Sequence, residues 1–466
     1  MPRKKDRPAD PSIKRTERLR VQPKDKLVAL LDELAAKHPE VEARLARHAL
    51  AGDPAALAAE FRRSLHAWKR STRFRPRGAA AAFGRELQSW LDEVERELLP
   101  LDPARAHALA EAFVNMDARL FDQADDSDGA IGDAVRAGCR LWLVAAKLRA
   151  DRSAAQWIDR IYALVNADEY GAREALLRHA DLLLAPADLR ALAARFEADL
   201  ERALTRHAGD RSDYSVFKAA SAVGLVADAL GDPDLSTRTT LRYSPAPNPL
   251  QKAHFVENYL RFDRPAEALA WLEGDWGRQE EQRERLLAQA CAALGDAAQL
   301  RAVRRRLFDR SGSASDFEAW RDSLAPAERS SAAAVAGERA QHTDDPITGA
   351  QLLLAVEDEV AAESLLVSRH ASVRGEEYYH LLPLAQTMEK RKRLLGAVVC
   401  YRALLLAILA RAYVRAYGHA ADYLAALREL DARVDNYQTL PTHEVFEAAL
   451  RDAHGRKLAF WRRLPT

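Results

Sequence analysis

The sequence predicts an all-α protein built as an α-solenoid, in which antiparallel helix pairs stack on one another. Leucines stand near the ends of the expected helices at almost even intervals. Subtraction gives gaps of 30, 34, 30, 30 and 30 residues between Leu230, Leu260, Leu294, Leu324, Leu354 and Leu384. A fixed period of about 20–50 residues is typical of stacked helical repeats, because one helix pair cannot bury its apolar face alone.

Length and composition support the same fold class. The chain has 466 residues, of which 48% are hydrophobic, and its commonest residues are strong helix formers. Gly and Pro number only 20 each and stand mostly between helical patterns, and no convincing period-two strand is found. At about 150 residues per domain, this length suits several domains or one long array.

Net charge excludes a global attraction to nucleic acid or membrane. Lys plus Arg number 70 against 69 for Asp plus Glu, a net charge of +1. The one candidate for a membrane segment, Leu394 to Ala410, is interrupted by Arg402 and is too short to span a bilayer. We expect a buried central helix there and no membrane partner.

Cysteine usage and the first residues predict a cytoplasmic protein. Cys139, Cys291 and Cys400 each lie in an apolar helical pattern, as reduced thiols of an intracellular protein do. The charged start, Met1 to Pro8, never leads into an apolar stretch and is no secretory signal.

The N-terminal half divides into a basic arm, residues 1–23, and a helical region, residues 24–230. The arm holds four prolines and cannot bury enough apolar surface to fold by itself. The run Leu27, Leu30, Leu31 and Leu34 has helical spacing, and Asp53-Pro54 is a cap followed by a first-turn proline. Further helices are expected at about 79–99, 103–122, 131–150, 153–166, 169–183 and 186–208.

A proline-rich linker, residues 231–249, is expected to lead into a C-terminal helical-repeat region, residues 250–466. Second helices should follow the short breaks at 262–265, 295–296, 325–326 and 357–358. The stretch Tyr259 to Leu269, with small Ala266 and Ala268, resembles the crossing point of a tetratricopeptide hairpin, which implies a degenerate tetratricopeptide- or HEAT-like array. Helices at 392–416 and 418–434 should cap it, with packing roles for Tyr401, Tyr413, Tyr417 and Tyr423.

A basic stretch, Phe61 to Arg85, contains no Asp or Glu. Cations interleaved with aromatic side chains can neutralise phosphates while bases stack on the rings. The alternative is that the arginines pair with acids elsewhere on the surface. The nucleic-acid candidates are Arg62, Arg63, Lys69, Arg70, Arg73, Arg75, Arg77, Trp68 and Phe74.

An acidic loop, residues 125–133, resembles part of a calcium-binding EF-hand. Its register leaves Ala124 and Val135 at two principal ligand positions, which argues against tight calcium binding. The alternative is a helix start, where Asp and Ser cap free N–H groups and face the positive end of the helix dipole. The residues of this cap or weak cation site are Asp125, Asp126, Asp128 and Asp133.

Catalytic motifs are scarce. Glu377 and His380 have the spacing of a di-iron ligand pair, but no second copy is found. His443 with Glu444 lacks the second histidine of a zinc protease helix, and no phosphate-binding loop, dinucleotide fingerprint or nucleophile elbow is present. We therefore assign no catalytic residue, metal, cofactor or small-molecule substrate.

The C-terminal stretch carries a distinctive pattern of spaced residues. It runs from Leu440-Pro441 through His443, Phe446, Leu450 and His454-Gly455-Arg456-Lys457 to Phe460-Trp461. Together with the acidic loop, it resembles an uncharacterised family of bacterial all-helical proteins, related to helical regions that follow SWIM zinc fingers. The resemblance implies a helical-repeat fold without an assigned activity. The chain lacks the Cys-x-Cys and Cys-x-His pairs of a SWIM finger, which weakens any nucleic-acid inference.

The same C-terminal residues also have a direct physical interpretation. Gly455 should end a helix, with Arg456 and Lys457 near its negative end. Phe460 and Trp461 should then fold back as an apolar anchor, or form a peptide contact if they are exposed.

These observations favour a non-enzymatic scaffold that binds a protein or peptide partner on an extended surface. The alternative is a nucleic-acid-associated accessory protein that uses the basic stretch and the N-terminal arm. An enzyme would require a deep cleft in which titratable groups converge.

Overall fold

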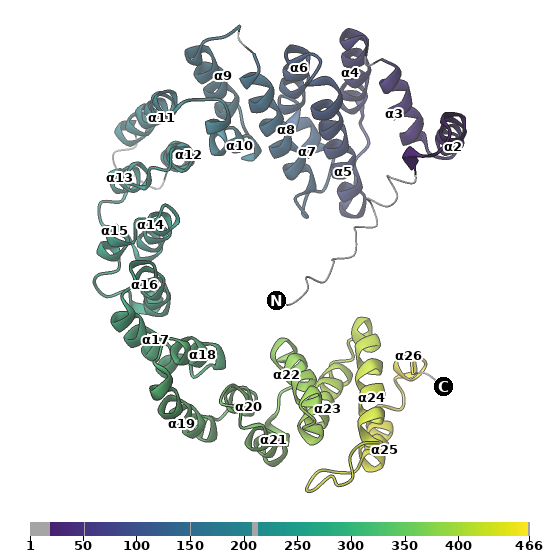
Figure 1. Ribbon diagram of the computed structural model, residues 1–466, viewed down its shortest axis with the longest axis vertical. Coiled ribbons are helices and arrows are strands. Elements are labelled where there is room, and N and C mark those ends of the chain that lie inside the picture. The colour runs from purple at the N-terminus through teal and green to yellow at the C-terminus, as the bar shows by residue number, and fades with distance from the viewer. Residues whose placement is uncertain (1–18, 51, 150, 207–212, 465–466) are drawn as a thin grey trace, which may run out of the picture. The chain divides into compact units, whose positions relative to one another are not determined.

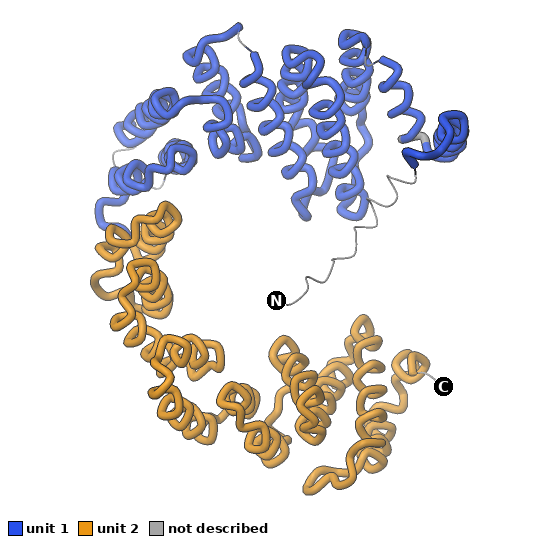
Figure 2. The backbone as a smooth tube through the Cα atoms, viewed as in Figure 1, with its two compact units in different colours: residues 1–247 blue, residues 248–466 orange. Residues whose placement is uncertain are grey.

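A computed structural model describes residues 19–50, 52–149, 151–206 and 213–464. The chain divides into two compact units, Met1–Pro247 and Asn248–Thr466 (Figure 2). In the described ranges the regular structure is helical, apart from one isolated bridge between Arg75 and Ala124, so the all-α prediction is confirmed (Figure 1). The predicted arm lies outside the described residues up to residue 18.

Unit 1 runs from α2 to α13. Its elements are α2 (Lys24–Lys37), α3 (Pro39–Ala49), α4 (Pro54–Arg70), α5 (Arg77–Glu93), π-helix η1 (Val94–Leu98), α6 (Pro103–Val114), α7 (Asp117–Asp122), α8 (Ala130–Lys147), α9 (Ala154–Asn166), 3-10 turn η2 (Ala172–Glu174), α10 (Ala175–Arg178), 3-10 turn η3 (Ala180–Leu182), α11 (Pro186–Arg206), α12 (Tyr214–Leu230) and α13 (Pro233–Tyr243). Some expected helices are divided: 103–122 into α6 and α7, and 169–183 into η2, the short helix α10 and η3.

Aspartate–proline pairs begin several helices of this unit. The Asp53 carboxylate accepts hydrogen bonds from the N–H groups of Ala55 and Ala56, and Pro54 occupies the first turn of α4. Asp102 caps α6 in the same way. A carboxylate at this position satisfies N–H groups that have no partner within the helix, and proline has no N–H to satisfy.

The core of unit 1 extends from α4 to α13, and α4, α5, α6 and α8 meet in its first part. Helix α4 packs on α6, and helix α5 packs on α8, so each skips the helix that follows it in sequence. Trp68, Trp90 and Phe113 form a cluster of ring contacts inside this interface, and Trp142 of α8 is fully buried. Packing of this kind, between helices close in sequence, is consistent with the expected solenoid.

The prediction of an irregular linker at 231–249 is wrong for most of its length. Residues 233–243 form α13, which packs on α12 and buries Leu235 and Thr239. Asp232 accepts a hydrogen bond from the Leu235 N–H, so Pro233 starts a helix instead of interrupting one. The two units meet in sequence just after this helix, between Pro247 and Asn248.

Unit 2 runs from α14 to α26. Its elements are α14 (Pro249–Arg261), α15 (Pro265–Trp271), η4 (Gly277–Gln279), α16 (Glu280–Leu294), α17 (Ala297–Ser311), α18 (Ala314–Asp322), α19 (Pro326–His342), α20 (Pro346–Ala355), α21 (Glu359–Ser368), η5 (His370–Ser372), α22 (Tyr378–Lys390), α23 (Leu394–Ala410), η6 (Val414–Ala416), α24 (Tyr417–Asp431), α25 (His443–His454) and α26 (Leu458–Trp461).

The helices of unit 2 stack on one another, and several of the evenly spaced leucines stand where one helix ends and the next begins. Leu260, Leu294 and Leu354 stand in the last turns of α14, α16 and α20, and a second helix follows each predicted break. Successive helices pack on each other, and α14 also contacts α16, α18 contacts α20, and α21 contacts α23. Asp263 and Glu357 take left-handed backbone conformations in two of the breaks.

The C-terminal helices form the expected end of unit 2. Helix α23 is buried along most of its length, and it packs against α22, α24 and α21. Tyr401 and Tyr417 are buried and Tyr423 is half-buried, but Tyr413 is exposed and has no core packing role. Among the described helices, none is long and apolar enough to cross a membrane.

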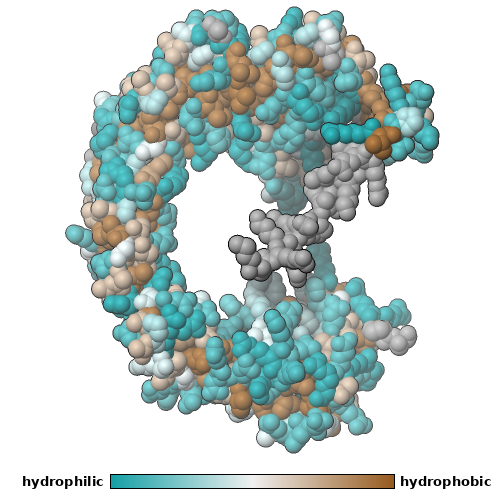
Figure 3. All heavy atoms as spheres, viewed as in Figure 1, coloured by the Kyte–Doolittle hydropathy of each residue, from teal (hydrophilic) through white to brown (hydrophobic). Residues whose placement is uncertain are grey.

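The surface is of mixed character. On the face drawn in Figure 3, hydrophilic residues cover most of each unit and apolar residues show in patches between them.

Candidate functional site

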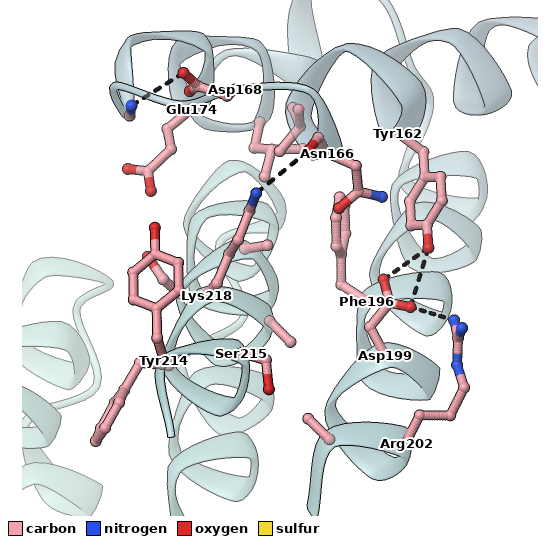
Figure 4. Close-up of a pocket in the computed structure, with 18 of the residues that line it drawn as sticks. Tyr162, Asn166, Asp168, Glu174, Phe196, Asp199, Arg202, Tyr214, Ser215 and Lys218 are labelled. Atoms are coloured by element: carbon pink, nitrogen blue, oxygen red, sulfur yellow. Dashed lines mark hydrogen bonds and ion pairs between the residues drawn. The ribbon is translucent and has the colours of Figure 1, made fainter. Parts of the chain in front are cut away.

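A pocket of about 570 Å³ opens in unit 1 between α9, η2, α10, α11 and α12 (Figure 4). Its lining mixes aromatic rings with charged groups of both signs. A pocket of this size and composition is where a binding site is first sought. We take this α9–α12 pocket as the candidate functional site.

One wall is a tight turn organised by Asp168. Its carboxylate accepts hydrogen bonds from the N–H groups of Tyr170, Gly171 and Arg173, and Gly171 has a φ of 79° that suits glycine. The next residue, Glu174, therefore enters the pocket from a fixed backbone position.

The opposite wall is the first turn of α12. Asp213 accepts a hydrogen bond from the Ser215 N–H and caps this helix. Tyr214 is 77% exposed, Phe217 is also exposed, and Lys218 donates from Nζ to the Asn166 carbonyl oxygen at 3.3 Å. Two aromatic residues thus stand at the rim of the pocket with a large part of their surface exposed.

A hydrogen-bonded network closes a third side. The Tyr162 hydroxyl donates to the Asp199 carboxylate, with 2.7 Å between Oη and Oδ2, and Arg202 forms an ion pair with the same carboxylate. Asp168 and Asp199 therefore already have partners within the protein.

Glu174 is the acid that differs. It is half-buried, and among the described residues it has no hydrogen bond or ion pair. Figure 4 shows the Tyr214 hydroxyl pointing toward its carboxylate across the pocket. Burial raises the pKa of Glu174, and the Asp168 carboxylate adds to the shift, against the opposing charges of Arg178 and Lys218. A half-buried carboxylate without a partner can bind a cation or a hydrogen-bond donor.

The nucleic-acid candidates of the basic stretch differ in exposure: some are buried or paired within the protein, and others are exposed. Trp68 is only 6% exposed, and its indole N–H donates to Glu86, so it cannot stack on a base and that assignment is wrong. A tryptophan at helical spacing is ambiguous in sequence, because core packing and base stacking use the same ring. Phe74, by contrast, is 59% exposed.

Several arginines of this stretch pair within the protein, as the alternative interpretation expects. Arg77 forms an ion pair with Asp128, and Arg63 forms one with Glu60. The Arg75 guanidinium lies 3.5 Å from the centre of the Phe83 ring, and burial lowers its pKa.

The remaining cations stay available at the surface. Arg62, Lys69, Arg70 and Arg73 are exposed, although Arg70 donates to the His66 carbonyl oxygen.

The acidic loop forms a helix cap. Asp126 accepts hydrogen bonds from the N–H groups of Ile131 and Gly132 at the start of α8. Asp125 accepts from Ser127, Asp128 pairs with Arg77, and the exposed Asp133 pairs with Arg136. Each carboxylate thus has a partner in the described chain, in which no cluster of three or more His, Cys, Asp and Glu residues could hold a metal.

The C-terminal motif anchors the chain end. Helix α25 ends at Gly455, and Phe460 is fully buried with its ring against those of Tyr417 and Trp461. The Trp461 indole donates to the His454 carbonyl oxygen at 3.0 Å. These contacts confirm the predicted fold-back.

The polar residues of the motif lie in different surroundings. Buried His443 stands 3.3 Å from Glu447, whose pKa falls to about 2 mainly because Arg428 hydrogen-bonds to it. Arg456 is exposed and Lys457 half-buried near the end of α25, where cations were expected.

Sequence reasoning missed the α9–α12 pocket. Its charged residues stand on α11, on α12, on the 3-10 turn η2 and at Asp168 before that turn, at spacings that match no motif. One available signal is Asp168 with Gly171, which indicates a fixed turn, followed three residues after the glycine by Glu174.

Comparison with curated proteins and with solved structures gave no significant match. The sequence profile described as "Family of unknown function (DUF6880)" matches residues 18–463. The match spans nearly the whole chain, both units included. The chain therefore belongs to the DUF6880 family of unknown function.

Proposed function

We propose that this protein is a non-enzymatic helical-repeat scaffold, and that its α9–α12 pocket binds a basic side chain of a peptide segment in a partner protein. The observation that carries the proposal is Glu174, a half-buried carboxylate with no hydrogen bond or ion pair among the described residues. A lysine or arginine of the partner would supply the missing charge.

The surroundings of Glu174 favour a peptide as the source of that cation. Exposed Tyr214 and Phe217 stand on one helix at the rim, and aromatic rings of this kind supply contact area for a peptide chain. A lysine or arginine stem packs on such rings while its charged end reaches the carboxylate. A hydrogen bond between charged groups adds about 1.5–3 kcal/mol, enough for a marked preference for basic peptides.

The test is selection of peptides from a random library on the full-length protein. We expect the selected peptides to contain Lys or Arg at a common position. Glu174→Gln, which removes the charge and keeps the shape, should weaken binding of those peptides about tenfold, a change of about 1.4 kcal/mol.

Glu169→Gln is the matched control. It makes the same change at an exposed position five residues earlier, outside the pocket lining. Selected peptides without a basic residue, or equal binding to Glu174→Gln and wild type, would rule out the proposed role of the pocket.

A second candidate function is nucleic-acid binding through the exposed part of the basic stretch. Arg70, Arg73 and Phe74 support it, because two exposed cations and an exposed ring stand close together in the sequence. Labelled single- and double-stranded DNA and RNA would be titrated at low and moderate salt. Binding should weaken with salt and vanish in Arg70→Glu/Arg73→Glu, and salt-independent binding would contradict the idea.

The finer features of the proposal rest on sequence. We place the protein in the cytoplasm, which its three buried free thiols support. We also propose a relationship to tetratricopeptide repeats, which rests on Tyr259–Leu269. A relationship to the helical regions that follow SWIM zinc fingers is proposed from the C-terminal motif.

A further inference from the structure

Arg402 occupies an unusual position in the middle of α23. Its residue surface is only 7% exposed, and its guanidinium lies 4.4 Å from the centre of the Phe446 ring and 5.3 Å from that of Tyr437. Nη1 donates to the Pro441 carbonyl oxygen at 2.9 Å. Nε and Nη2 are buried and have no hydrogen-bond partner in the described chain.

Asp431 interacts electrostatically with this charge, but no carboxylate of the described residues is in direct contact with it. Arg402 has no ion pair among the described residues, and the acid of nearby Asp431 already accepts a hydrogen bond from the Tyr437 hydroxyl at 2.7 Å. Burial lowers the pKa of Arg402, yet a guanidinium keeps its proton in proteins. A buried cation with two unused N–H groups is costly unless an anion joins it.

Arg402 lines a cavity of about 460 Å³ within unit 2. Apolar side chains of α23, among them Val399 and Leu406, form one wall, and Leu440 and Phe446 form another. The third wall is the segment from His370 to Glu376, where the Gly375 backbone lies so close to α23 that an added Cβ would stand 2.0 Å from the Ala403 carbonyl oxygen.

The charges of the rim are mixed. His370 and Arg374 contribute to the lining from the third wall, with Glu376 beside them. Arg374 and Glu376 are both exposed and therefore screened by water, whereas Arg402 is not. The interior of the cavity thus combines one desolvated cation with an apolar lining.

We propose that this cavity binds an apolar carboxylate, with the carboxylate on Arg402 and the apolar body along α23. A carboxylate accepts two parallel hydrogen bonds from a guanidinium, and Nε and Nη2 are the two N–H groups that remain unused. The cavity has the volume of a small-molecule site, about 300–1,000 Å³. The apolar walls favour an aliphatic or aromatic acid over inorganic phosphate.

The two unpartnered nitrogens of Arg402 are not open to the cavity. Both are covered in this arrangement of side chains, and the half-buried Phe446 ring lies on the guanidinium. Binding of a carboxylate to these nitrogens therefore requires a rearrangement of the side chains around the guanidinium, of which the Phe446 ring is one.

Calorimetry on the full-length protein tests the proposal with octanoate and with octanol, which has the same chain without the charge. We expect octanoate to bind at least about tenfold more tightly than octanol. Equal binding of the two, or no binding of octanoate and of the peptides below, would overturn the proposal without any variant.

The apolar carboxylate could be a free acid or the C-terminus of a peptide, and two further probes separate these sources. A short peptide that ends in leucine with a free carboxylate is compared with the same peptide amidated. Binding of the free peptide alone would identify a peptide C-terminus, and binding of octanoate alone would identify a free acid.

Arg402→Met completes the test, because it keeps the apolar stem and removes the charge. Binding of the carboxylate should be lost, while the variant stays folded, since replacing a buried unpaired charge by an apolar side chain is often neutral or stabilising. Arg374→Gln at the exposed rim is the control, with a loss of less than about threefold. Unchanged carboxylate binding in Arg402→Met would assign Arg402 a purely structural role. The same conclusion would follow if Arg402→Met unfolds and the wild-type protein binds octanoate no better than octanol.

Discussion

Arg173 and Asp117 form a bidentate ion pair inside unit 1, with 2.8 Å between Nε and Oδ2 and 2.7 Å between Nη2 and Oδ1. The two side chains are only 7% and 2% exposed, and the remaining arginine nitrogen donates to the Leu164 carbonyl oxygen. The pair joins α7 to the turn that carries Glu174. It therefore holds in place the turn that forms one wall of the α9–α12 pocket.

Asp117→Ala should lower the free energy of unfolding of unit 1 by about 3–5 kcal/mol, because it leaves the Arg173 charge buried and unpaired. Urea denaturation of the full-length protein measures this loss. Asp159→Ala, which breaks the exposed ion pair with Arg195, is the control and should cost less than about 1 kcal/mol. Similar losses in the two variants would contradict the importance of burial.

His107 should make the protein less stable in mild acid. Burial between Trp142 and Trp157 lowers its pKa from 6.5 to about 4, so the folded protein holds the ring neutral. The contribution of the neutral ring to the free energy of unfolding is therefore fully present above 6.5, the pKa of His107 in the unfolded chain. It is lost as the pH falls from 6.5 toward 4. The total loss amounts to about 3 kcal/mol.

Denaturation of wild type and His107→Phe at pH 7, 5.5 and 4.5 checks this prediction. The variant cannot titrate at this position, so its stability should fall less over the same window. Glu447 does not interfere in this window. Its pKa falls from 4.5 to about 2 on folding, so the stability that depends on its charge is lost below pH 4.5. The same pH dependence in both proteins would rule out His107 as the cause.

Two glycines should respond in opposite directions to the same substitution. Gly375→Ala places a Cβ 2.0 Å from the Ala403 carbonyl oxygen, and the forced displacement should lower stability by about 1–3 kcal/mol. Gly337→Ala, within α19 and with nothing near the new Cβ, should raise stability by up to about 1 kcal/mol. Thermal unfolding of the two variants gives the comparison, and a harmless Gly375→Ala would mean that the segment moves away from α23.

The three thiols should not react in the folded protein. Cys139, Cys291 and Cys400 are all buried, and burial raises the pKa of each thiol. The thiolate is the reactive species, so an aromatic disulfide reagent should label them only after denaturant is added. Rapid reaction of one thiol in native protein would show a local opening around it.

Local helix signals made much of the fold predictable. Asp53-Pro54 begins a helix because the carboxylate and the missing proline N–H both act within one turn, and the evenly spaced leucines report the stacking of neighbours. The same chemistry begins α13 at Asp232-Pro233, but three further prolines nearby favour an irregular segment when the sequence alone is considered.

Sites that depend on tertiary contacts could not be predicted. Trp68 gives the same signal in sequence whether it packs in a core or stacks on a base, and its burial against the rings of Trp90 and Phe113 decides between them. In the described part of the chain, Glu174 has no hydrogen bond or ion pair and Arg402 has two nitrogens without a hydrogen-bond partner, and both facts depend on residues brought together by folding.

The stacking of helices also bears on how each unit folds. Most helix contacts join elements one or two places apart along the chain, so few long loops must close before apolar surface is buried. Low contact order of this kind is associated with fast folding. Helix α2 buries no residue, whereas α8 buries eleven, so amide protons should exchange first at the N-terminal end of unit 1 and last around α8.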